Sequence, residues 1–290
     1  MAEQRSQNEW SRRRFVQRAA IGWASVHAVG LVPSARAQAS EKPKLDFPLF
    51  DLHVHPSTRL SIARAGEIAK TRKMLFGMVE HVGPRYRIKT NEDLKQYIDA
   101  VRKAGMVVGL QPTFPNWRKR FDKDLLKQVD YILMDALEIP NPDGSRWLIW
   151  RSDTKVDDKE AFMGRYLDFY LQIIATEDID VLAATAYLPP CLAKDYDQLW
   201  NEKRMRTLIN AAVKNKVALE ITQHFQRPTA RFVRMAKAAG AKFTFGTNSR
   251  TEQGVGTIPY CLKLAHECGL TAKDIWLPKF RPPRIQPRNT

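Results

Sequence analysis

The sequence predicts an α/β fold, built as one parallel βα barrel of seven strand–helix units. From residue 46 onward, short apolar runs alternate with segments of helical spacing. The runs are nearly continuous rather than alternating, which is typical of parallel strands covered on both faces. Seven such units in about 230 residues fit one barrel better than two domains. An open doubly wound sheet is the main alternative, but the first βα turn, residues 55–59, has no glycine and so lacks the dinucleotide-binding fingerprint.

The expected strands, in chain order, are Pro48–Val54, Leu75–Val82, Val107–Pro112, Tyr131–Ile139, Val181–Thr185, Val217–Thr222 and Lys242–Gly246. The helices between them have apolar residues at i, i+3, i+4 and i+7, as in residues 94–101. Thr90 and Asp93 resemble a capping box in front of that helix. A longer helix is expected from about Asp158 to Thr176, and others near residues 205–213, 232–239 and 259–269.

Residues 1–37 resemble a cleavable twin-arginine signal peptide. A basic start around Arg12–Arg14 is followed by a weakly apolar stretch over residues 19–32 and an A-x-A site at residues 35–37. The alternative is a short N-terminal helix with a basic lead. We therefore expect a periplasmic protein, anchored if the signal is not cleaved. Its barrel would span residues 38–278, ahead of a basic, Pro-rich tail over residues 279–290.

Composition excludes several classes of protein. Apolar residues make up 44% of the chain, too many for a disordered protein. Three cysteines without C-x-x-C spacing provide neither a disulfide framework nor a zinc knuckle. No run of about 18 uncharged apolar residues follows residue 40, so no transmembrane segment is expected in the mature chain. The net charge is +16, but the basic residues are scattered among acidic ones, so we expect a solvated basic surface and no nucleic-acid partner.

The ends of the first, second and fourth strands carry candidate metal ligands. His53 and His55 lie two residues apart on an extended strand, so their imidazoles share a side and are suited to bind one cation. Asp51 is in phase with them and is expected to orient a ring. His81 is a third candidate, although it is equally consistent with a turn residue. Glu138 is the candidate bridging or proton-accepting carboxylate, and Asp135 is a weaker one.

The sixth and seventh strands provide candidate catalytic residues. Glu220 lies inside an apolar strand, where burial favours a structural or catalytic pairing. Asn248 and Arg250 suit anion or substrate binding better than metal binding. Residues 141–144 predict a hairpin insertion near residues 139–152, which either packs on the barrel or serves as a lid. The tryptophans in the strand-end loops, 117, 147 and 150, suit stacking on a sugar, although such residues more often pack.

Together these motifs resemble the polymerase-and-histidinol-phosphatase (PHP) superfamily over about residues 47–250. The most specific are the opening H-x-H and the pair L-E-I-x at Glu220 and F-G-T-N at Asn248. The resemblance implies a distorted seven-stranded TIM-like barrel that binds divalent zinc, manganese or iron and hydrolyses phosphoesters. It also implies that His53 and His55 share one metal, that His81 binds another and that Glu138 bridges them.

The sequence departs from the family pattern at two strand ends. Thr185 and its neighbours replace the usual histidine after the fifth strand, and Asn248 and Arg250 replace an aspartate and a histidine after the seventh. Arg cannot bind a metal, so one or two ions are expected rather than three. Three hypotheses follow: a metal-dependent hydrolase of an anionic substrate, a single-metal lyase or isomerase of a sugar-like substrate with Glu138 or Glu220 as base, and a non-catalytic ligand-binding barrel.

Overall fold

The computed structural model describes residues 45–141 and 143–279, and their fold is a nearly closed parallel βα barrel. Its sheet has the strand order β1-β2-β3-β4-β7-β8-β9. The bounds are β1 Phe50–Val54, β2 Leu75–Val82, β3 Val107–Pro112, β4 Tyr131–Met134, β7 Val181–Leu182, β8 Ala218–Thr222 and β9 Phe243–Gly246. The end of β1 meets the chain just after β9 at a parallel bridge between Val54 and Ser249. The predicted fold class, a seven-unit TIM-like α/β barrel, is confirmed.

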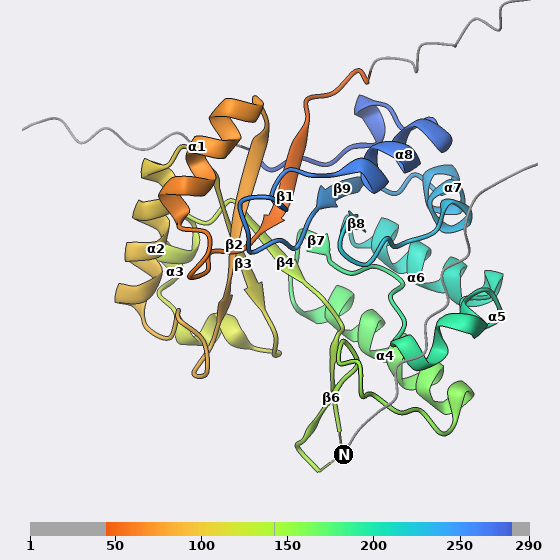
Figure 1. The fold of residues 1–290 in the computed structure, drawn as a ribbon. Helices are drawn as coiled ribbons and strands as arrows, with labels where there is room; N and C mark the ends of the chain where they lie inside the picture. Colours follow the sequence, from red (N-terminus) through yellow and green to blue (C-terminus); the bar gives the residue numbers. More distant parts are fainter. Residues whose placement is uncertain (1–44, 142, 280–290) are drawn as a thin grey trace, which may run out of the picture. The chain divides into compact units, whose positions relative to one another are not determined.

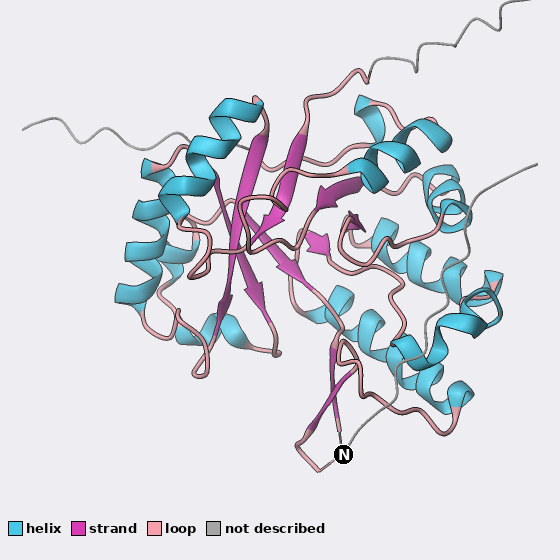
Figure 2. Cartoon of the chain, viewed as in Figure 1, coloured by secondary structure: helices cyan, strands magenta, loops and turns pink. Residues whose placement is uncertain are grey.

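Helices flank the strands (Figures 1 and 2). Their bounds are α1 Ile62–Arg72, α2 Asn91–Lys103, α3 Lys123–Leu126, α4 Lys159–Thr176, α5 Tyr196–Leu199, α6 Glu202–Lys214, α7 Ala230–Ala238 and α8 Pro259–Glu267. Helix α2 begins with the predicted capping box: the Asp93 N–H donates to Thr90 Oγ1 (3.2 Å) and the Thr90 N–H donates to Asp93 Oδ2 (3.0 Å). The predicted helix spacings therefore correspond to real helices that bury their apolar faces.

Two strands end earlier than the sequence predicts. The fourth run divides at Asp135, whose Oδ1 accepts the Leu137 N–H (2.8 Å), and residues beyond it form β5 (Glu138–Pro140) outside the barrel. The fifth strand ends at Leu182 because Ala184 and Ala186 have positive φ angles of 48° and 56°, which turn the chain out of the sheet. Apolar content predicted both runs, but local turns ended them early.

Strand β5 pairs antiparallel with β6 (Arg146–Leu148) in a hairpin that leaves the sheet (Figure 1). The turn between them places Gly144 at φ 82°, and the Gly144 N–H donates to the Asn141 carbonyl (3.0 Å). This is the hairpin predicted near residues 139–152. The predicted signal peptide and nearly all of the predicted tail lie outside the described residues. Within the described residues, no helix combines the length and apolarity needed to span a membrane.

Candidate metal centre

His53 of β1 and His55, which directly follows that strand, meet at the C-terminal end of the barrel strands, where functional sites of such barrels gather. His53 and His55 are both buried, with 2% and 1% of their surface exposed. Their Nε2 atoms lie 3.1 Å apart. Gln111, near the end of β3, places its Oε1 3.2 Å from the same Nε2 atom of His53. The structure therefore brings three potential ligand atoms together, two of them on the predicted residues.

These separations fit a divalent ion. Zinc–nitrogen bonds are about 2.0 to 2.1 Å long, so two adjacent ligand atoms on one ion lie about 2.8 to 3.4 Å apart in octahedral to tetrahedral arrangements. The 3.1 Å and 3.2 Å separations around His53 Nε2 fall in that range. Two imidazoles and an amide oxygen are also a chemically suitable donor set.

Glu220 of β8 binds the ring nitrogen of His53 that does not face His55. The Nδ1–H of His53 donates to Glu220 Oε1 (2.6 Å), and the Ala184 N–H donates to Glu220 Oε2 (2.8 Å). Burial alone would lower the pKa of His53, but the Glu220 carboxylate raises it above its ordinary value, helped by Asp135 and Asp51. A carboxylate on the far nitrogen of a ligating histidine sets the ring's tautomer and orientation.

The structure places Glu220 and Asp51 away from the pocket. Of the structural and catalytic roles expected for Glu220, its 1% exposure, its absence from the pocket lining and its bond to His53 favour the structural one. Asp51, expected to orient a ring, instead accepts the backbone N–H groups of His53, Thr247 and Gly256 (2.9 to 3.2 Å). The carboxylate that reaches the His53 ring comes instead from β8, a strand that does not pair with β1.

Gln111 was not among the sequence-predicted site residues. Its Nε2 donates to Asp135 Oδ2 (2.7 Å), which leaves its Oε1 directed at His53. Asp135, the weaker of the two acidic candidates after the fourth strand, thus orients Gln111. A polar residue near the end of the apolar third run was the only sequence signal for Gln111.

A second cluster joins His55 to Glu80 and His81 of β2. Potential ligand atoms of these three residues all lie within 4.8 Å of one another. The His81 ring stacks on His55 with centroids 4.9 Å apart and an interplanar angle of 4°. Glu80 Oε1 accepts the His81 N–H (2.9 Å) and lies 3.7 Å from its Nδ1. The sequence identified His81, whereas Glu80 was missed as a ligand candidate.

Glu138 lies outside both clusters, contrary to the expectation that it bridges metals. It begins β5 in the hairpin, and its Oε2 pairs with Arg146 Nη1 at 3.4 Å. Burial raises the pKa of Glu138, and the nearby Asp135 raises it further, whereas Arg146 opposes the shift. Strand β4 ends four residues before Glu138, so the chain leaves the barrel there and places this carboxylate at the wall of the pocket.

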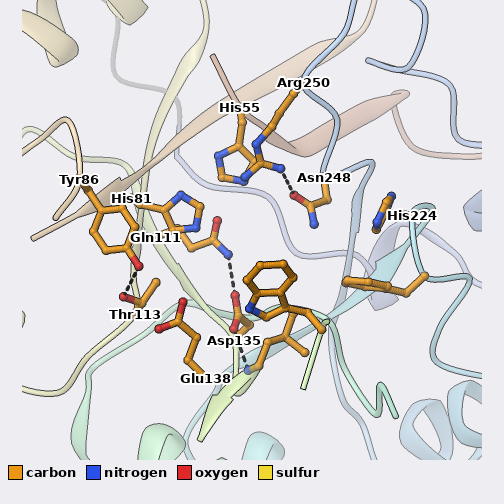
Figure 3. Close-up of a pocket in the computed structure, with 13 residues that line it drawn as sticks. His55, His81, Tyr86, Gln111, Thr113, Asp135, Glu138, His224, Asn248 and Arg250 are labelled. Atoms are coloured by element: carbon orange, nitrogen blue, oxygen red, sulfur yellow. Dashed lines mark hydrogen bonds between the residues drawn. The ribbon is translucent and has the colours of Figure 1, made fainter. Parts of the chain in front are cut away.

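His55 and His81 line a pocket of about 410 Å³ (Figure 3). Its lining residues are His55, His81, Tyr86, Gln111, Thr113, Asp135, Leu137, Glu138, Trp150, His224, Phe225, Asn248 and Arg250. Arg250 and Asn248 lie near His55, with Asp135 and Glu138 across the pocket. Arg250 Nη1 donates to Asn248 Oδ1 (3.1 Å). The pocket thus has a positively charged side beside the histidines and an acidic side opposite.

Electrostatics keep His55 neutral. Burial lowers its pKa well below the ordinary value, and the charges of His53, His81 and Arg250 lower it further. The pKa of His224 is also lowered, first by burial and then by Arg250. A neutral imidazole keeps the lone pair that binds a metal ion.

Comparisons with known proteins leave the family open. No family model matches the chain, and no curated protein matches it. A chain of an archaeal ribonuclease P solved with mature tRNA is 11% identical, covering 76% of this chain and 87% of that one, with a TM-score of 0.39. Dihydroorotase from Campylobacter jejuni is 14% identical over 80% of this chain and 78% of that one (TM-score 0.37).

β-Mannanase from Streptomyces thermolilacinus is 12% identical over 72% of each chain, again with a TM-score of 0.37. Similarities this low carry no inference about activity. Fold and site together define a βα barrel with a buried histidine cluster at the C-terminal ends of its strands.

Proposed function

We propose that this protein is an enzyme, a metal-dependent hydrolase that cleaves a phosphoester or a related anionic bond. The observation that carries the proposal is the convergence of His53, His55 and Gln111 at 3.1 and 3.2 Å beside an open pocket. These residues would hold one divalent ion, zinc, manganese or iron. The cluster of His55, Glu80 and His81 is the place for a second.

A divalent ion bound there would act as a Lewis acid and lower the pKa of a coordinated water to about 7. The chain's own residues supply the rest. Glu220 keeps the His53 ring in place, and Arg250 binds the anionic group of the substrate with a charge-assisted hydrogen bond. Glu138 lines the pocket with a raised pKa, which suits a carboxyl that gives a proton to the departing oxygen.

We further propose that the chain is a divergent member of the PHP superfamily, exported through the signal-like residues 1–37. Asn248 and Arg250 stand where that family keeps an anionic ligand and an imidazole. Both side chains line the pocket and are hydrogen-bonded to each other. The permanent positive charge of Arg250 would therefore replace part of the positive charge that metal ions supply in the family. This arrangement agrees with one or two ions rather than three.

Elemental analysis of the purified, folded protein tests the proposal. We expect stoichiometric metal in the parent protein, its loss in His53→Ala, and full retention in His266→Ala, a matched control on α8 away from the pocket. Hydrolysis of 4-nitrophenyl phosphate with added Mn²⁺ should follow the metal content. Metal without hydrolysis would favour the single-metal lyase or isomerase with Glu138 as its base. Absence of metal would favour the non-catalytic barrel.

A further inference from the structure

Trp150 is an exposed tryptophan at the wall of the pocket. Among the described residues, Trp150 and Leu49 are the large apolar side chains that are exposed, with 49% and 39% of their surface accessible. Trp117 and Trp200, in contrast, are fully buried. Trp150 lines the pocket of the metal centre, whereas Leu49 does not. An exposed indole costs hydrophobic free energy, and at the wall of a polar pocket it offers a flat apolar surface to a ligand.

The hairpin and the residues that lead from it to Trp150 are anchored by several contacts. Ile149 is fully buried, and its N–H donates to the Leu137 carbonyl (3.0 Å). Trp147 packs edge-on against Phe162 of α4 with ring centroids 5.1 Å apart. Arg165 of the same helix donates to the Pro140 carbonyl (3.2 Å). The chain that leads into Trp150 is therefore anchored to the barrel and to α4, and the indole lines the wall of the pocket.

The rest of the pocket provides hydrogen-bonding groups of mixed character. Asp135 and Glu138 are carboxyl groups, Thr113 carries a hydroxyl and Asn248 an amide. Sugar hydroxyls both donate and accept hydrogen bonds, and a pyranose ring also has an apolar face of C–H groups. A lipid chain would require an apolar lining throughout. At about 410 Å³, the cavity lies within the range of about 300 to 1,000 Å³ that holds small ligands.

We propose that Trp150 stacks on a sugar ring and that the substrate is a sugar phosphate, its phosphate held by Arg250 and its ring by the indole. Only the phosphate-binding half of this proposal depends on the hydrolase function proposed above. Arg250 and Trp150 line the same pocket, so one ligand can reach both. The sugar thus determines specificity, while the metal centre and Arg250 act on the ester.

Equilibrium binding to the metal-loaded full chain tests this inference. Isothermal titration calorimetry would compare the non-hydrolysable phosphonate analogue of glucose 6-phosphate, glucose and inorganic phosphate as probes. We expect this sugar phosphate analogue to bind more tightly than phosphate, and Trp150→Ala to weaken its binding about tenfold while changing phosphate binding less than about twofold. Trp150→Phe should restore most of the affinity, because the flat aromatic face remains. Leu49→Ala, the matched exposed apolar control, should change nothing.

Each alternative outcome has a distinct meaning. Equal weakening of sugar phosphate and phosphate by Trp150→Ala would overturn the sugar site, as would equal affinity for the two ligands in the parent protein. Absence of binding by both sugar probes would also overturn it. Binding of glucose that depends on Trp150, without any binding of phosphate, would support the sugar site and contradict the phosphoesterase. Hydrolysis of 4-nitrophenyl phosphate does not need the indole, so the two proposals can fail separately.

Discussion

Replacing Gly246 with alanine should weaken metal binding, because the added methyl group would displace Glu220 or His53. A Cβ at this position would overlap Glu220 Oε1 and stand 2.5 Å from His53 Cβ and 3.1 Å from Glu220 Cδ. Non-bonded carbon atoms pack at about 3.5 to 4.0 Å, so His53 or its neighbours must move by about 1 Å. Neither side chain can move easily, because His53 and Glu220 are both buried and hydrogen-bonded to each other at 2.6 Å.

Two magnitudes follow from that displacement. Loss of the carboxylate that holds a ligating histidine typically costs about 10- to 100-fold in metal affinity, or about 1.4 to 2.7 kcal/mol. Overpacking of a rigid core adds about 1 to 3 kcal/mol of lost folding stability. In a domain of this size, each kcal/mol lowers Tm by about 2 to 4 °C.

Competition with a chromophoric chelator measures the metal affinity, and thermal unfolding of the metal-free protein measures the stability. Gly164→Ala in α4 is the matched control, because no atom lies within 4 Å of its added Cβ. That control should keep full metal affinity and gain up to about 1 kcal/mol from helix propensity. A Gly246→Ala protein with parental metal affinity and parental Tm would refute the role assigned to Glu220.

Three further results are expected. Removing the metal with EDTA should lower Tm, since an ion present at 100 times its Kd stabilises by about 2.7 kcal/mol, and His53→Ala should abolish this response. Asp130→Ala should cost about 3 kcal/mol in urea unfolding, because it leaves Arg102, only 11% exposed, without the carboxylate that it binds at 2.5 and 2.7 Å. Burial raises the pKa of Tyr260 from 10.0 to about 12, so between these values the folded state keeps a proton that the unfolded state loses. Stability should therefore decline as pH rises from 10 to 12, and Tyr260→Phe should make that decline less steep in urea titrations across this range; an unchanged slope would contradict the assignment.

Strand positions could be predicted because each barrel strand is buried on both faces, and burial selects a continuous apolar run. β2 and β3 have the predicted bounds, and β8 differs by one residue. The fourth and fifth runs were predicted too long because apolar content continues beyond the strand. There the hydrogen bond from the Leu137 N–H to Asp135 and the positive φ angle of Ala184 set the ends.

The candidate site was only partly predictable. The shared side of His53 and His55 follows from the two-residue repeat of a strand, which is a local property of the sequence. The partners of these histidines come from residues 58 and 167 positions away, Gln111 and Glu220. No local pattern specifies which polar residue of a distant strand reaches a given ring.

The sequence by itself therefore determined the seven alternating units, the hairpin after the fourth strand and the histidine pair, because burial and strand periodicity act over a few neighbouring residues. Only the tertiary structure decided that Glu220 supports His53, that Gln111 joins the cluster and that Glu138 belongs to the pocket wall. Those contacts depend on the register between strands and on where each chain segment turns. Both are set by packing of the closed barrel, which couples residues far apart in the chain.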